Sequence, residues 1–180
     1  YKEFDRLYER LGITFESVAG ESFYVDKMQD TIDRFQEKGL LEISQGATIV
    51  DLEEWDMPPL IMLRSDEASL YATRDLAALE YRWAKYSFEK VIYVVDVSQT
   101  LHFRQLFKAL ELMDYEWADR CKHAVFGRLR FKDGAMSTRR GKVVFLEDVL
   151  DKAVELALEI IEEKNPDLPD KEGVAEDVGV

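Results

Sequence analysis

The sequence predicts an α/β fold with parallel strands, and its pattern and composition together indicate this. Strand-like apolar runs alternate with helix-like segments through residues 60–131. The order strand–helix–strand–helix–strand implies parallel strands that are joined by right-handed crossovers. Of the 180 residues, 47% are hydrophobic, so the chain can bury one substantial core.

The first elements predict a strand, a helix and a hairpin. Residues 12–16, GITFE, have the composition of a short strand. Residues 24–39 carry apolar side chains at helical spacing and end at a glycine, which predicts a helix. Two apolar runs, 40–44 and 47–52, are separated only by the dipeptide QG, so we expect an antiparallel hairpin there.

We expect the central segments, residues 60–131, to form the unit of parallel strands and crossover helices. Its strands are predicted at 60–65, 90–96 and 122–131, and its helices at 73–86 and 98–113. The run KVIYVVD is continuously apolar and β-branched, as expected of a strand that is buried on both faces. Ligands of parallel sheets bind beyond the carboxyl ends of the strands. The segments that leave those ends are residues 65–75, 96–102 and 133–146, and we expect them to build one site.

The C-terminal segment predicts a single helix. Residues 147–164 have helical periodicity and stop near a proline. Residues 165–180 are polar, acidic and interrupted by Pro and Gly, so we expect them to be loosely ordered.

Charge is unevenly distributed along the chain. The formal net charge is −13, which argues against non-specific binding of nucleic acid by the whole surface. Residues 120–142, however, contain eight Lys or Arg and one Asp, whereas residues 143–180 contain twelve Asp or Glu and three Lys. The basic segment therefore remains able to hold a phosphate.

Composition also limits the compartment and the chemistry. No apolar run reaches the length of about 18 residues that a membrane span needs, so no membrane association is expected. The single cysteine, Cys121, excludes an internal disulfide and fits a reducing compartment, which favours a cytoplasmic protein. We interpret Cys121 as a small buried apolar residue rather than a nucleophile. His123 lies two residues away without a second ligand pair, so the sequence predicts no metal site.

Tyr71 and Asp75 are the first candidate binding residues. They lie four residues apart near the start of a helix, so they share one face. An aromatic ring beside a carboxylate suits a planar cation, because the ring offers its face and the carboxylate two oxygens. The alternative is structural: Asp in the first turn favours the helix dipole, and Tyr is often a core residue.

Gln99 and His102 follow the strand at 90–96. The Gln99 side chain can extend into the crevice at the strand's end, or it can form a capping box with Asp96 three residues earlier. His102 can approach a nucleotide or pack between helices. Both interpretations stay open for each residue.

The loop at 133–146, DGAMSTRRGKVVFL, has the chemistry of a phosphate site. Its two glycines permit unusual backbone angles. Ser137 and Thr138 supply hydroxyl groups, and Arg139 and Arg140 supply forked donors for phosphate oxygens. No P-loop pattern occurs in the sequence. The alternative is a solvated basic hairpin turn.

These segments resemble arginyl-tRNA synthetases, which are class I aminoacyl-tRNA synthetases. The resemblance is carried by SDEASLYATRDLA, VIYVVDVSQTLHFRQLF, HAVFGRLRF and AMSTRRGKVV, in the family's order. It implies the C-terminal half of a Rossmann-like nucleotide-binding catalytic domain within residues 1–146, with a hairpin insertion at about 40–60. Residues 147–180 then form an exit helix and an acidic tail, and EGVAEDVGV is similar to the entrance of the family's helical anticodon-binding domain.

The resemblance also implies roles for the candidate residues. Tyr71 and Asp75 recognise the guanidinium of L-arginine, Gln99 helps to hold the amino acid, and Gly127 lies near adenine.

The loop resembles the family's Lys-Met-Ser-Lys-Ser signature, with Ala135 and Thr138 in the places of the two lysines. Met136, Ser137, Thr138 and Arg139 then bind ATP, and Arg139 and Arg140 carry the catalytic role.

The implied reaction joins L-arginine to its tRNA through an arginyl-adenylate, with ATP giving AMP and pyrophosphate. Mg²⁺ accompanies ATP, and no tightly bound cofactor is implied. The His-Ile-Gly-His signature does not occur in these 180 residues, nor does the anticodon-binding domain, so we expect an incomplete and inactive part. Two alternatives remain. One is another nucleotidylyltransferase of the same broad fold, and the other is a non-catalytic module whose acidic helix binds a basic partner.

Overall fold

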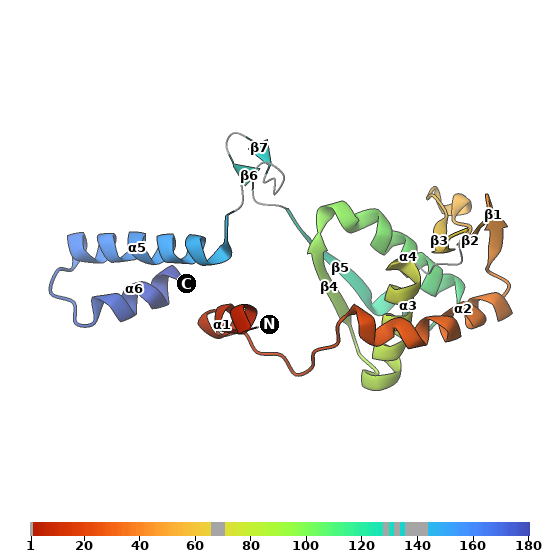
Figure 1. Cartoon of the computed structure of the whole chain (residues 1–180), viewed down its shortest axis with the longest axis horizontal. Coiled ribbons are helices and arrows are strands. Elements are labelled where there is room, and N and C mark those ends of the chain that lie inside the picture. The colour runs from red at the N-terminus through yellow and green to blue at the C-terminus, as the bar shows by residue number, and fades with distance from the viewer. Residues whose placement is uncertain (1, 66–70, 128–129, 132–133, 136–143) are drawn as a thin grey trace. The chain divides into compact units, whose positions relative to one another are not determined.

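The chain forms two compact units in the computed structural model. Residues 2–65, 71–127, 130–131, 134–135 and 144–180 are described. The larger unit comprises residues 19–128, and the smaller unit comprises residues 1–18 and 129–180 (Figure 1). The domain boundary that the sequence suggests between residues 146 and 147 stays a prediction.

The larger unit combines an antiparallel sheet, a parallel sheet and α-helices. Its strands are β1 (Glu42–Ser44), β2 (Ala47–Val50), β3 (Leu60–Leu63), β4 (Val91–Asp96) and β5 (Cys121–Phe126). Its α-helices are α2 (Met28–Glu37), α3 (Tyr71–Tyr86) and α4 (Thr100–Leu112), and its 3₁₀ helices are η1 (Glu21–Lys27), η2 (Glu53–Trp55), η3 (Val97–Gln99) and η4 (Ala118–Arg120). The mixed α/β fold class is confirmed.

The predicted hairpin is present and carries a third strand. β1 pairs antiparallel with β2 across a turn in which Gln45 and Gly46 both have positive φ, the conformation that two-residue hairpin loops favour. β3 also pairs antiparallel with β2. The sequence analysis placed this strand in the parallel unit, and that expectation is wrong. β3 instead inserts Leu60 and Met62 into the core from the edge of the hairpin sheet.

The parallel sheet consists of β4 and β5, paired in register from Val91–Cys121 to Asp96–Phe126. Burial alternates along β4. Val91, Tyr93 and Val95 pack against the core, whereas Ile92 and Val94 are 56% and 68% exposed. The expectation that this strand is buried on both faces is therefore wrong for this structure. Its apolar side chains on one face meet the core, and those on the other face meet solvent.

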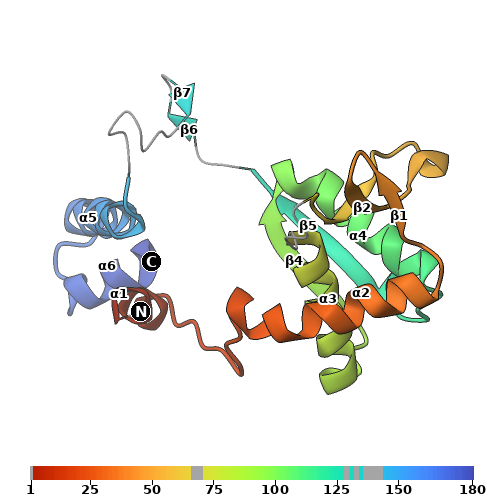
Figure 2. The ribbon, with the colours of Figure 1, turned by 45° about the vertical axis from the view of Figure 1, so that its right-hand side comes forward.

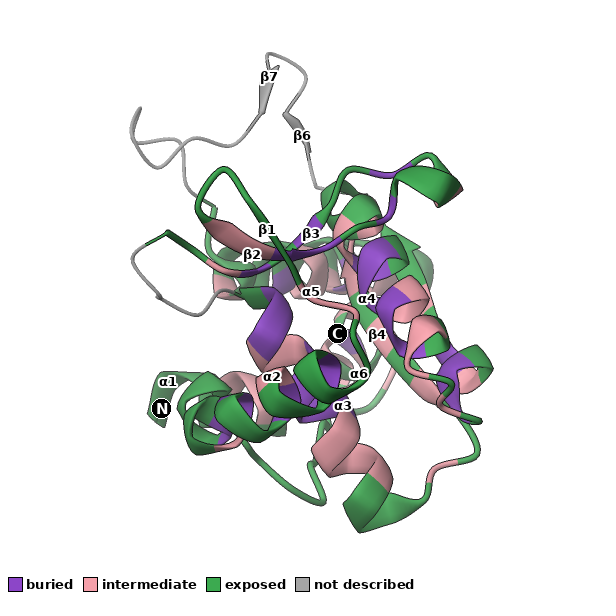
Figure 3. Cartoon of the chain, turned by 90° about the vertical axis from the view of Figure 1, so that its right-hand side faces the viewer, coloured by how far each residue is buried: buried purple, intermediate pink, exposed green. Residues whose placement is uncertain are grey.

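The core of the larger unit lies where α2, α3 and α4 meet both sheets. Its largest fully buried side chains come from the three helices and from the antiparallel sheet with the segment after β2: Phe35, Val50, Leu52, Met62, Leu76, Leu79, Leu106 and Leu110. The parallel sheet contributes the partly buried Val91, Tyr93 and Val95. Figure 3 shows the buried segments gathered on the facing sides of these elements. One hydrogen bond fixes the start of α3, because the buried Thr73 hydroxyl donates to the carbonyl of Met62 on β3. The N-terminal turn of α3 is thus anchored to the antiparallel sheet.

The smaller unit is built from helices and one short strand pair. Its helices are α1 (Lys2–Arg10), α5 (Leu146–Lys164) and α6 (Lys171–Gly179), and its strands are β6 (Arg130–Phe131) and β7 (Gly134–Ala135), which pair antiparallel (Figure 2). The predicted helix at 147–164 is confirmed as α5. The expected strand at 12–16 does not form. Gly12 ends α1 with a φ of 63°, and the backbone N–H of Ile13 donates to the carbonyl of Tyr8 at 2.8 Å.

Residues 165–180 were expected to be loosely ordered on their own, and in the structure Lys171–Gly179 form α6, which packs on α5. The Asp170 side chain caps the helix by accepting from the backbone N–H of Gly173 at 3.2 Å. Ala175 is fully buried. A Cβ at Gly179 would lie 2.7 Å from backbone atoms of Val154 on α5, so only glycine permits this close approach of the two helices. Packing on α5 thus orders a segment whose composition alone predicts a loose tail.

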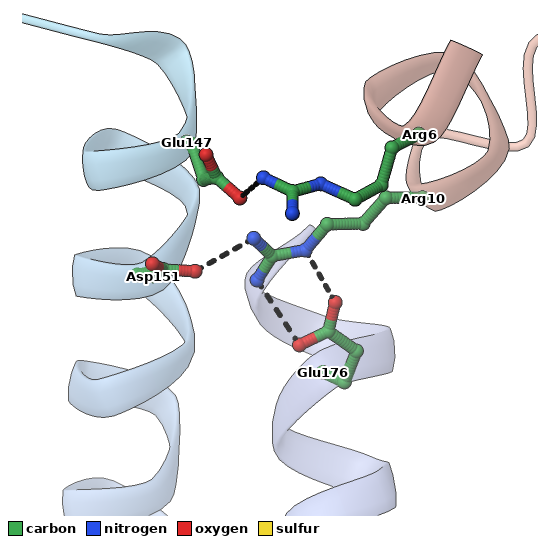
Figure 4. Close-up of polar contacts among 5 residues, drawn as sticks. All are labelled: Arg6, Arg10, Glu147, Asp151 and Glu176. Carbon is green, nitrogen blue, oxygen red and sulfur yellow. Dashed lines mark hydrogen bonds and ion pairs between the residues drawn. The ribbon is translucent and has the colours of Figure 1, made fainter. Parts of the chain in front are cut away.

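Arg10 joins α1, α5 and α6 of the smaller unit. Its guanidinium binds both carboxylate oxygens of Glu176 on α6, at 2.7 and 3.2 Å, and Asp151 on α5 at 2.6 Å (Figure 4). Arg6, one turn earlier, binds Glu147. The two carboxylates around Arg10 raise the pKa of its guanidinium. Basic residues on α1 therefore face acidic residues on α5 and α6.

Candidate functional site

The candidate site lies where β4 ends and the first turns of α3 and α4 meet. η3 follows β4 directly, and α4 follows η3 without a break. α3 packs against α4, so the first turns of the two helices carry their side chains to the carboxyl end of the sheet. Three of the sequence-predicted residues, Tyr71, Asp75 and Gln99, stand on these elements.

Tyr71 is the first residue of α3, and its ring is 68% exposed. The guanidinium of Arg74 lies over this ring, 5.1 Å from its centroid. Arg74 also pairs with Glu21 at 3.0 Å. The Tyr71 ring thus already faces one guanidinium, which is the type of contact proposed for a planar cation.

Asp75 lies one turn after Tyr71 and contacts His102 on α4. The distance between Asp75 Oδ2 and His102 Nε2 is 2.7 Å. The two side chains are 34% and 23% exposed, so the pair is open to solvent on one side. The His102 ring packs edge-on against the ring of Phe103, at 5.4 Å between centroids. The helix-packing interpretation of His102 is confirmed, with Asp75 as its polar partner.

Gln99 is exposed and immediately precedes α4. The capping interpretation fits Asp96 rather than Gln99, because Asp96 Oδ1 accepts from the backbone N–H of Ser98 at 3.0 Å. Gln99 ends η3, and His102, the partner of Asp75, follows three residues later in the first turn of α4.

The nucleotide-binding residues predicted from the sequence are only partly described. Gly127 follows β5 directly and is exposed, and no other residue lies within 4 Å of a Cβ built on it. The space beside this position is therefore open. The remaining predicted residues, Met136, Ser137, Thr138, Arg139 and Arg140, lie outside the described residues.

Cys121 and His123 take structural positions on β5. Cys121 is 4% exposed, and burial raises the pKa of its thiol to about 11. Such a thiol is a poor nucleophile. The His123 ring packs on Phe103 at 4.5 Å, and its Nε2 lies 3.0 Å from the carbonyl oxygen of Val95.

The described part of the chain contains no group of three or more His, Cys, Asp or Glu residues that could hold a metal ion. Among the same residues, no helix is long and apolar enough to cross a membrane.

Sequence reasoning missed two residues that shape the site, His102 as the partner of Asp75 and Arg74 as the partner of Tyr71. His102 lies 27 positions from Asp75, and no spacing rule connects residues on different helices. Arg74 lies three positions after Tyr71, a helical spacing that could have indicated their contact.

Comparison with known proteins gives one consistent family. The family described as "tRNA synthetases class I (R), catalytic domain" matches residues 1–180. An arginine–tRNA ligase of Halothermothrix orenii is 59% identical over 179 residues, and one of Clostridium beijerinckii is 54% identical over the same length. Each alignment covers 99% of this chain and 32% of the relative. The chain thus spans about a third of the length of these curated relatives.

Solved structures agree with this result. The arginyl-tRNA synthetase of Plasmodium falciparum superposes with a TM-score of 0.78 at 29% identity, over 99% of this chain and 30% of that one. The enzyme of Thermus thermophilus superposes with a TM-score of 0.72 at 23% identity, over 87% of this chain and 32% of that one, and supports the fold.

Proposed function

The chain belongs to the family of class I arginyl-tRNA synthetase catalytic domains, and we propose that it is the part of such a ligase that holds L-arginine and closes on ATP. The observation that carries the proposal is the open Asp75 carboxylate, one helical turn from the Tyr71 ring at the carboxyl end of β4. The full-length protein would join L-arginine to tRNA in the cytoplasm, a compartment that the single cysteine of these 180 residues fits.

In this proposal, Tyr71 and Asp75 select the side chain of arginine. The guanidinium stacks on the Tyr71 ring and pairs with the Asp75 carboxylate, while Gln99 binds the polar end of the amino acid. The position of the Arg74 guanidinium over the Tyr71 ring, 5.1 Å from its centroid, supports this role, because it is the kind of contact that a bound arginine would make. Arginine has to replace Arg74 or use the other face of the ring.

The loop that follows β7 would supply the phosphate chemistry. Met136, Ser137, Thr138 and Arg139 bind ATP, Gly127 lies beside adenine, and Mg²⁺ enters with ATP as part of the substrate. The arginine carboxylate attacks the α-phosphorus of ATP, and pyrophosphate leaves.

No side chain acts as a nucleophile in these steps. The site aligns the two substrates, and Arg139 and Arg140 stabilise the charge that builds on the pyrophosphate. The terminal ribose hydroxyl of tRNA then attacks the arginyl carbonyl, and AMP leaves.

Pyrophosphate exchange tests the proposal. The full-length protein should exchange labelled pyrophosphate into ATP with L-arginine, and citrulline should not replace arginine. Citrulline has nearly the same shape but no positive charge, so it separates charge recognition from shape recognition. Exchange without arginine would favour the rival nucleotidylyltransferase. Absence of exchange together with absence of ATP binding would favour the interaction module.

A further inference from the structure

A single side chain holds the Asp75 carboxylate in the described part of the larger unit. Asp75 Oδ2 lies 2.7 Å from His102 Nε2. Within the described residues, Oδ1 has no hydrogen-bond partner. Within the described residues, the protein thus engages one oxygen of this carboxylate and leaves the other without a hydrogen bond.

His102 is itself held firmly. It stands in the first turn of α4, next to Phe103, which is 5% exposed. The Phe103 ring packs against four other rings, those of His102, Tyr93, His123 and Phe107, with centroids 5.4, 4.9, 4.5 and 5.8 Å away. The imidazole thus projects from a rigid, aromatic-lined helix start.

We infer that His102 is a positioning residue for arginine: its Nε2–H fixes Oδ2 of Asp75 so that Oδ1 presents to the substrate guanidinium. This inference rests on the proposed function. An aspartate side chain on a helix rotates about two bonds and so occupies several rotamers. Every rotamer that cannot bind arginine lowers the population of the one that can. A hydrogen bond from a rigid partner removes that freedom before arginine binds, as second-sphere donors do for metal-binding carboxylates.

The chemical type of the donor matters. An imidazole donates from Nε2 without a permanent positive charge, unlike Lys or Arg. A fixed cation at this position would neutralise Asp75 and compete with the guanidinium for it. Arg82, a cation on the same helix as Asp75, does not neutralise this carboxylate, since its guanidinium donates to the Tyr93 hydroxyl instead. A donor such as His102 thus orients the carboxylate and leaves its charge for the substrate.

Three variants of the full-length protein test the inference by steady-state pyrophosphate exchange. His102→Ala should raise the KM for arginine about tenfold, with the KM for ATP changed less than about twofold, because a lost hydrogen bond to a charged group is worth at least a factor of ten. His102→Gln keeps a neutral donor and should recover most of the arginine KM. His102→Lys should be at least as poor as His102→Ala.

His123→Ala is the matched control, because His123 packs on the same Phe103 ring but bonds to a backbone carbonyl. It should leave the ratio of the two KM values unchanged.

Each outcome decides a separate point. An unchanged arginine KM in His102→Ala overturns the inference, as do equal increases in both KM values, which would indicate a general loss of structure. His102→Gln performing no better than His102→Ala overturns the donor role, and His102→Gln alone decides the case if His102→Ala does not fold. A wild-type protein that shows no arginine-dependent exchange overturns the proposed function, and the inference with it.

Discussion

At the scale of single residues, the Asp75 side chain is the most informative position. In the full-length protein, Asp75→Asn keeps the size of the side chain but removes the charge. We expect the arginine KM to rise about 10- to 100-fold, because a charged hydrogen bond is worth about 1.5–3 kcal/mol. The ATP KM should change little. The measurement is arginine-dependent pyrophosphate exchange over a range of both substrates.

The same variant also tests the structural alternative. Unchanged arginine kinetics in a normally folded Asp75→Asn protein would return Asp75 to the role of a helix-start residue that favours the dipole.

Arg139 and Arg140 carry the second residue-scale prediction. Arg139→Ala should lower the rate of adenylate formation about 10²-fold, with little effect on arginine binding, because the forked donor strengthens its contact as charge develops on pyrophosphate. The double alanine variant should lose more, since either arginine can replace the other in part. Single-turnover formation of adenylate at saturating substrates measures this.

Arg139→Lys is the control for geometry. It keeps the charge but not the planar fork, so it should recover only part of the rate. A folded double variant that forms adenylate at the wild-type rate would make the loop a solvated turn.

The residues of the proposed arginine site were predictable to different degrees. Tyr71 and Asp75 follow from their spacing on one helix, and Gln99 from its place after a strand, together with the resemblance to the family. His102 was identified in the sequence, but its partner was not. The Asp75–His102 contact depends on how α3 packs on α4, which no local pattern encodes.

At the scale of elements, helix docking in the smaller unit depends on Arg10. Arg10→Ala should increase amide hydrogen exchange in α1, because the side chain binds Glu176 through two oxygens and Asp151 as well. Arg6→Ala is the matched control, since Arg6 binds only Glu147 and is far more exposed. Equal exchange in the two variants would show that Arg10 has no special role. High salt should reduce the difference.

The elements that the sequence predicted best are the long periodic ones. α3, α4 and α5 were recognised because their apolar spacing extends over several turns. α6 has a weak local signal, because it is a polar nine-residue helix, and it forms against α5. β3 was predicted as a strand, but its partner was not, because pairing with β2 depends on tertiary contacts rather than on the local pattern.

At the scale of the whole molecule, we expect pyrophosphate exchange to require parts of the catalytic domain that these 180 residues do not include. The chain spans about a third of its relatives' length, and the His-Ile-Gly-His signature that completes the family's ATP site does not occur in it. We therefore expect arginine-dependent pyrophosphate exchange by the purified 180-residue chain to be at background. The full-length protein is the positive control. Measurable exchange by the short chain would show that these residues form a sufficient site.

Because Cys121 is buried, the rate at which its thiol is labelled can be used to measure how often the larger unit opens. It is the chain's single cysteine, it is 4% exposed, and burial raises the pKa of its thiol to about 11, so the folded state presents little reactive thiolate to a reagent. A thiol-specific reagent should therefore modify the protein only during transient opening, so the labelling rate measures the free energy of that opening. Labelling of the native chain as fast as a free cysteine would contradict this. A ligand that binds the larger unit can then be detected without any assay of turnover, because it slows the labelling.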